Sequence, residues 1–114
     1  MKIYIATPVN GRPEATLKRK REKAFDRVGE LIGIIEDYYE ENYPDIEIEC
    51  HSSFDIDIAP LGIVGVDEAT IMGRCVQRVM ECDAIYMDKG WSNSDGCSIE
   101  HYTAVVYKKK IISL

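Results

Sequence analysis

The sequence predicts an α/β fold with a parallel sheet, because short apolar runs alternate along the chain with longer segments of helical periodicity. Helical patterns occupy the stretches between four apolar runs, at residues 2–6, 46–50, 83–87 and 111–114. The stretch from Asp83 to Glu100 joins one such run to a polar loop and the start of a helix. That order places the loop at the carboxyl edge of a sheet, where open α/β folds bind their ligands.

The first half of the chain predicts strand, helix and strand. Lys2 to Ala6 is rich in β-branched residues and is expected to be a central strand. A rigid loop with two prolines follows at residues 7–13. The long helical pattern after it ends near Asn42, since Pro44 disfavours helical geometry just before it. Apolar residues then alternate with glutamates over residues 46–50, which predicts a half-buried edge strand.

The second half begins with a segment, residues 51–65, that has no clear period and reads as a long loop. A second helix follows, with Asp67 or Thr70 as its cap, and ends near Cys82. The third strand covers residues 83–87, and the last covers residues 111–114.

A third helix is expected from about Cys97 to Lys108, capped by Ser94 or Asp95. Gly96 is expected to relieve a tight turn before it. Its predicted apolar face consists of Ile99, Ala104 and Val105, flanked by Tyr102 and Val106.

This alternation implies right-handed crossovers with helices on both faces of the sheet. We therefore expect a single domain over residues 1–114, a flavodoxin-like three-layer sandwich whose four parallel strands take the order 2-1-3-4. The chain then changes its winding direction between strands one and three, and the loops that leave these two strands flank a crevice.

Composition and charge argue against several classes of partner and location. The net charge of −6 argues against a nucleic-acid polymer as partner, because such binding depends on neutralising phosphates. No apolar run approaches the roughly 20 residues of a membrane span. The start of the chain shows no signal-peptide pattern, and the four cysteines form no closely spaced pair. We expect a cytoplasmic protein with reduced thiols, no membrane partner, no cofactor and no metal.

The two loops at the predicted crevice supply the candidate site. Signatures for dinucleotides, triphosphates and the serine elbow of hydrolases are absent from the sequence. Hydroxyl and amide donors, an aromatic wall and a carboxylate at a helix start suit a sugar or a nucleoside, since a carboxylate can attack or stabilise an anomeric carbon. The candidates are Tyr4, Pro8, Asn10, Gly11, Arg12, Asp88, Trp91, Asn93, Ser94, Gly96 and Glu100.

Structural roles compete with each of these interpretations. Glu100 also suits a helix start, where the dipole favours acidic residues. Trp91 and Tyr4 also suit packing positions. His51 is either an acid–base group or a surface hydrogen-bonder. The basic cluster at residues 18–23 is either a solvated helix face or a lure for an anionic ligand.

Two segments carry a family resemblance. Residues 2–12, KIYIATPVNGR, and residues 82–104, CDAIYMDKGWSNSDGCSIEHYTA, resemble the nucleoside 2-deoxyribosyltransferase-like superfamily, above all its short bacterial and phage members. The more specific part is Gly-Trp-x-x-Ser-x-Gly-x-x-x-Glu at residues 90–100.

The resemblance implies roles for particular residues. Glu100 would be the nucleophile, Tyr4 would lie beside it, and Ser94 would contact the sugar or phosphate. In the monophosphate glycosidases of this superfamily the first loop binds the 5′-phosphate, which implies that role for the segment Asn10-Gly11-Arg12. Cys75 stands where the family usually has an aspartate.

The function expected on this basis is an N-glycosidase or deoxyribosyltransferase-like enzyme acting at C1′ of a nucleoside or its 5′-monophosphate. The alternatives are a non-catalytic binding module for a nucleotide or an ADP-ribose-type ligand, and a small interaction protein without a ligand. We also expect a homodimer or higher homo-oligomer, because the short last helix and strand leave apolar surface uncovered.

Overall fold

The structure is a computed structural model that describes residues 1–8, 14–55 and 68–113. Its strands form one sheet in the order β2-β1-β3-β4, and every pair of neighbours is parallel. This confirms the predicted α/β class and strand order. The helices and strands follow one another as β1 (Lys2–Ala6), α1 (Glu14–Asn42), β2 (Glu49–Ser52), α2 (Glu68–Glu81), β3 (Ala84–Met87), α3 (Asp95–Val106) and β4 (Lys110–Ile112).

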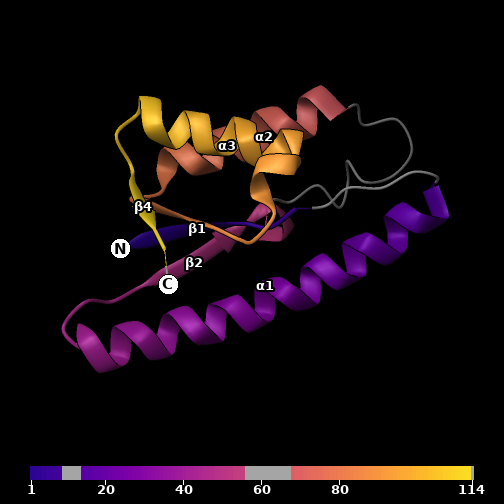
Figure 1. The fold of residues 1–114 in the computed structure, drawn as a ribbon. Helices are drawn as coiled ribbons and strands as arrows, with labels where there is room; N and C mark the ends of the chain where they lie inside the picture. Colours follow the sequence, from indigo (N-terminus) through magenta and orange to yellow (C-terminus); the bar gives the residue numbers. More distant parts are fainter. Residues whose placement is uncertain (9–13, 56–67, 114) are drawn as a thin grey trace.

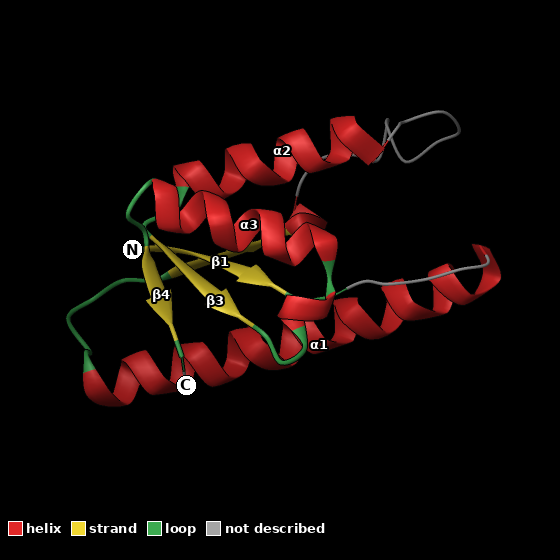
Figure 2. Cartoon of the chain, turned by 45° about the horizontal axis from the view of Figure 1, so that its top comes forward, coloured by secondary structure: helices red, strands yellow, loops and turns green. Residues whose placement is uncertain are grey.

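The sheet separates two helical layers. Helix α1 covers one face, while α2 and α3 lie side by side on the other (Figure 1 and Figure 2). Successive side chains of a strand point to opposite faces of the sheet, so the side chains of β1 pack alternately against the two helical layers. Ile3 and Ile5 belong to the cluster that packs with α1, whereas Tyr4 and Ala6 belong to the cluster that packs with α2 and α3. Tyr4 is thereby turned toward the helix that carries Glu100.

Strand β2 lies later in the chain than predicted. The sequence indicated a strand at residues 46–50, but the structure pairs Glu49–Ser52 with β1, in a register that runs from Lys2 opposite Glu49 to Ile5 opposite Ser52. The pairing begins at Glu49 because this residue lies opposite Lys2, the first residue of β1. Ile46 therefore precedes the sheet and is exposed, while His51 belongs to the strand rather than to a loop.

Helix α3 turns a different face inward than predicted. The expected apolar face was wrong for all but Ala104: the buried residues of the helix are Cys97, Glu100, Thr103 and Ala104. Ile99, Tyr102, Val105 and Val106 are exposed instead. Helical periodicity shows which residues share a face, and here the face that packs on the sheet carries the candidate site.

Other boundaries differ by small amounts. Helix α3 begins two residues before the predicted position and ends at Val106, shortly before Lys108 takes a left-handed φ of 57°. Thr70 lies inside α2 and is not its cap, and Asp67 lies outside the described residues. Strand β4 begins one residue early, at Lys110. Within the described ranges, no helix is both long and apolar enough to cross a membrane.

A pair of short 3-10 turns completes the described chain. The first, η1 (Ser53–Asp55), follows β2. The second, η2 (Trp91–Asn93), lies in the loop between β3 and α3. This second turn belongs to the segment that the sequence analysis places at the crevice.

Candidate functional site

The described residues that follow β1 and β3 lie close together at the carboxyl edge of the sheet, as predicted. The backbone N–H of Asp88 donates to the carbonyl of Ala6 at 2.9 Å, which extends the pairing of the two strands. Gly90 has a φ of +83°, in the left-handed region that favours glycine, and a Cβ built on it would lie 4.0 Å from Pro8 Cγ. The glycine that makes the tight turn is therefore Gly90, whereas Gly96 lies inside α3.

A buried hydrogen bond joins Tyr4 to Glu100 at the centre of the site. The Tyr4 hydroxyl donates to Glu100 Oε2 from the middle of β1, across a separation of 96 residues in sequence. Tyr4 is 1% exposed and Glu100 is 5% exposed. The structure thus brings together the two residues that the sequence analysis named as catalytic candidates.

Burial dominates the acidity of this pair. Loss of solvent raises the pKa of Glu100 from 4.5 to about 7, and the hydrogen bond from Tyr4 partly opposes that rise. Burial, reinforced by the nearby carboxylate, raises the pKa of Tyr4 well above 10, so the phenol keeps its proton and remains a donor. Near neutral pH, Glu100 is therefore divided between its acidic and ionised forms.

The helix dipole does not explain this behaviour. Glu100 was expected in the first turn of its helix, but α3 begins at Asp95, so Glu100 is its sixth residue and belongs to the second turn. Stabilisation of a carboxylate by the dipole falls off within the first turn. The ionised form of Glu100 therefore depends mainly on Tyr4.

Two buried thiols border the pair. Cys75, on α2, lies beside Tyr4, and burial raises the pKa of the Cys75 thiol to about 11. Burial likewise raises the pKa of Cys97 to about 11. Both groups are neutral at physiological pH, so they contribute no charge beside Glu100. The thiols of the three buried cysteines, Cys75, Cys82 and Cys97, are free.

The loop before α3 places Ser94 and Asn93 in different environments. Ser94 is buried and caps α3, because its hydroxyl accepts from the N–H of Cys97 at 3.3 Å. Asn93 has an exposed side chain, and its backbone N–H donates to the carbonyl of Gly90. Of the two predicted caps, Ser94 fills the position, and Asp95 is the first residue of the helix.

Trp91 stacks on His101, which lies next to Glu100 in α3. The two rings are 4.2 Å apart between centroids, at an angle of 24°. Trp91 is half-buried and packs on the cluster that contains Tyr4. The packing role expected for Trp91 is thus confirmed, and its role as an aromatic wall for a ligand stays a prediction. His101 was not among the predicted residues, since nothing in its sequence position indicated the stacking.

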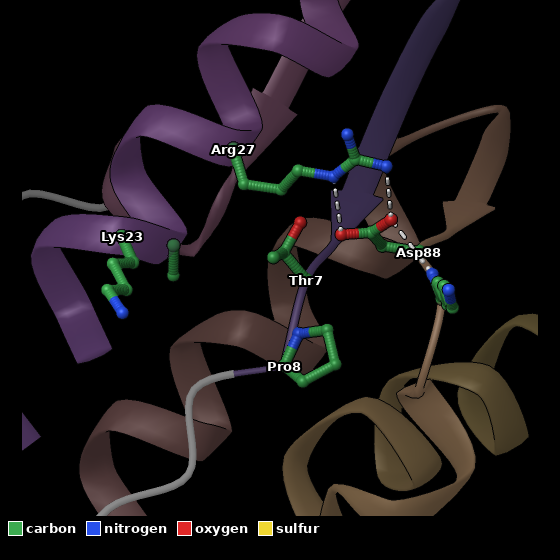
Figure 3. A pocket seen from close by; sticks show the side chains of 7 residues that line it. Thr7, Pro8, Lys23, Arg27 and Asp88 are labelled. Atoms are coloured by element: carbon green, nitrogen blue, oxygen red, sulfur yellow. Dashed lines mark hydrogen bonds and ion pairs between the residues drawn. The ribbon is translucent and has the colours of Figure 1, made fainter.

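Arg27 of α1 forms a two-pronged ion pair with Asp88, which follows β3 (Figure 3). Its Nε lies 3.2 Å from Asp88 Oδ2, and its Nη2 lies 3.1 Å from Oδ1. Asp88 also accepts from the N–H of Lys89 at 2.8 Å and is buried. These bonds join α1 to the end of β3.

A shallow pocket of about 340 Å³ lies beside this ion pair. Lys23 and Lys89 bring two further cations to it, and Thr7 Oγ1 is buried there without a hydrogen bond to any described residue. The pocket lies on the side of α1, and neither Tyr4 nor Glu100 lines it. The lining residues are Thr7, Pro8, Lys23, Ala24, Arg27, Asp88 and Lys89.

Several predicted residues lie either outside the described part of the chain or away from the Tyr4–Glu100 pair. Asn10, Gly11 and Arg12 lie outside the described residues, so their expected role in phosphate binding stays a prediction. Of the basic cluster, the described Lys23 side chain lies at the pocket. His51 lies on β2 opposite Tyr4, with its Nε2 3.2 Å from Glu49 Oε1.

Comparison with known proteins identifies the family. No curated protein and no solved structure matches the chain. A family model described as "Domain of unknown function (DUF4406)" matches residues 1–113, which is nearly the whole sequence. The chain therefore belongs to the DUF4406 family.

Proposed function

We propose that this protein is an N-glycosidase or a deoxyribosyltransferase-like enzyme that acts on nucleosides or their 5′-monophosphates. The observation that carries the proposal is the buried Tyr4–Glu100 pair, which joins the middle of β1 to α3. A buried carboxylate with a strongly shifted pKa in such a position is a candidate catalytic group. The resemblance of residues 90–100 to the nucleoside 2-deoxyribosyltransferase-like superfamily supplies the substrate class.

In the proposed reaction, ionised Glu100 attacks C1′ of the sugar. Tyr4 engages Oε2, so Oε1 is the attacking oxygen. A bond forms between Oε1 and C1′ while the bond from C1′ to the base nitrogen breaks, and the base leaves with that electron pair and takes up a proton. Water, or a second base, then attacks C1′ and releases Glu100 as a carboxylate, with loss of a proton from the attacking group.

Access to Glu100 is a requirement of this mechanism. Its side chain is 5% exposed, and the pocket beside Arg27 does not reach it. The sugar must therefore gain contact with Oε1 through a local rearrangement of the side chains around Glu100. Binding energy from the remote parts of a substrate can drive such a change.

The test is release of free base from a panel of nucleosides and nucleoside 5′-monophosphates, measured by chromatography. Glu100→Gln keeps the shape of the side chain and removes the nucleophile, so base release should disappear while ligand binding largely remains. Glu81→Gln is the matched control, because Glu81 is an exposed glutamate on the neighbouring helix α2. Equal rates for the wild type and Glu100→Gln would contradict the proposal.

A second candidate function is a non-catalytic binding module for a nucleotide or an ADP-ribose-type ligand. The observation in its favour is Cys75, a neutral thiol against Tyr4 at the position where the resembling family usually has an aspartate. This module would raise the melting temperature in the presence of its ligand, since ligands that bind only the native state stabilise it. Thermal stabilisation without base release would favour the module over the enzyme.

A further inference from the structure

The outward face of α3 carries several exposed apolar residues, whereas an ordinary amphipathic helix on a sheet turns a polar face to solvent. Ile99 is 45% exposed and Tyr102 is 70% exposed, and Val105 and Val106 are about half exposed. The inward side of the same helix holds Glu100 and Thr103. A contiguous apolar surface of this kind marks a site of interaction with another protein surface.

The apolar residues form a stripe with a charge at each end. Asp95, Ile99, Tyr102 and Val106 are separated by four, three and four residues, so they lie along one face of α3. Asp95 begins this α3 stripe. Lys108, which is exposed, follows its other end. The α3 stripe is therefore acidic at its start, apolar in its centre and basic just beyond its end.

We propose that the α3 stripe is the interface with a second copy of this chain, in which the two α3 helices pack antiparallel across a two-fold axis. A two-fold interface uses the same patch on both partners, so each contact occurs twice. The antiparallel arrangement places Asp95 beside the partner's Lys108, and Ile99 against the partner's Tyr102. A parallel arrangement would bring like charges together. The α3 stripe is thus complementary to itself, and this selects a second copy as the occupant.

This interface is distinct from the proposed active site, although both use α3. Glu100 faces the sheet, whereas Ile99 and Tyr102 face away from it. Contact with a second copy would cover the exposed apolar side chains of α3 and leave the Tyr4–Glu100 pair in place. The inference does not depend on the proposed function, and the two fail independently.

The first test measures the mass of the chain by sedimentation velocity over a range of concentrations. We expect a dimer whose dissociation constant rises by roughly 30-fold or more in Tyr102→Asp, because a charge then replaces a central aromatic contact. The matched control is Ile34→Asp, since Ile34 is an exposed apolar residue on α1, on the other face of the sheet. A monomeric wild type, or equal loss of dimer in both variants, would overturn the proposal.

A second test uses charge reversal and does not rely on a residue at the centre of the α3 stripe. Asp95→Lys and Lys108→Glu should each weaken their own homodimer, because like charges then meet at both ends. Mixed in equal amounts, the two variants should form a heterodimer in which both contacts are attractive again. A mixture that stays as dissociated as the separate variants would overturn the antiparallel arrangement. Circular dichroism of each variant checks that α3 remains folded.

Discussion

Arg27 and Asp88 form an ion pair in the wall of the pocket beside α1, with both oxygens of the carboxylate engaged by one guanidinium at 3.1 and 3.2 Å. Arg27 lies on α1 and Asp88 follows β3, 61 residues later. The pair ties the first helical layer to the loop that carries Gly90 and Trp91. Asp88 is buried, while 40% of the Arg27 side chain is exposed. The bonds therefore hold the loop at its base and leave part of the cation in contact with solvent.

Arg27→Ala should lower the free energy of unfolding by about 1–2 kcal/mol, because it leaves a buried carboxylate without its charged partner. The partial exposure of Arg27 keeps this value well below that of a fully buried pair. Asp88→Asn should lower the free energy of unfolding by a smaller amount. The loss in the double variant should be smaller than the sum of the two single losses. Urea denaturation of the four proteins measures this coupling, and strict additivity would show that the two residues act separately.

Glu100 makes stability fall as pH rises. Its pKa is about 7 in the folded chain and near 4.5 when unfolded, so the folded state binds more protons between these values. The stabilisation is complete below about pH 4.5 and is lost through pH 7, to a total of up to about 3 kcal/mol. Thermal melts from pH 5 to 8 should show this slope in the wild type and a flatter one in Glu100→Gln. The same slope in both proteins would refute the role of Glu100.

Base release should rise across the same pH range in which stability falls, because only ionised Glu100 can attack C1′. Tyr4→Phe removes the one contact that opposes the upward shift of the Glu100 pKa. Its activity profile should therefore move to higher pH, with a loss of about 1 kcal/mol in stability. Rates measured from pH 5 to 9 provide the check. A lower rate with an unchanged midpoint would indicate that Tyr4 does not set the acidity of Glu100.

The affinity for phosphorylated ligands should depend on the cationic side chains near the loop that follows β1. Lys23 lies at the pocket, and Arg12 belongs to the segment that the resemblance links to a 5′-phosphate. Lys23→Ala and Arg12→Ala should each weaken a nucleoside monophosphate more than the free nucleoside, because the phosphate alone carries the charge that they attract. Lys110→Ala is the control, because Lys110 is an exposed cation at the start of β4, at the opposite edge of the parallel sheet from the pocket. Titration calorimetry with both ligands measures these affinities. An equal loss of affinity for the two ligands would contradict a role in phosphate binding.

The fold was predictable because its signals are local. The β-branched run of β1 and the helical periodicity of α2 can be recognised from neighbouring residues. The alternation of strands and helices then predicts that the strands are parallel. The position of β2 was not predictable, since it depends on the register in which the segment pairs with β1. The inward face of α3 was missed for a related reason: its buried side includes Glu100 and Thr103, which sequence patterns assign to solvent.

The candidate site could be predicted in part. Glu100 and Tyr4 were named from a motif and a strand position, and the structure joins them. Arg27 was missed because a cation among many on a charged helix gives no sign of the carboxylate that it meets 61 residues later. His101 was missed because its stacking on Trp91 depends on how the β3–α3 loop turns back over the helix.

Tyr4 and Glu100 are 96 residues apart in the sequence, and this separation limits when the pair can form during synthesis of the chain. Strand β1 is made first by the ribosome, yet it is a central strand and needs β3 on its other side. Loop closure over such a distance costs entropy before any contact is gained, which slows folding. A nascent chain that has not yet exposed α3 therefore leaves Tyr4 without its acceptor. The buried pair can therefore form only once α3 has been synthesised, and fragments that end before α3 cannot assemble it.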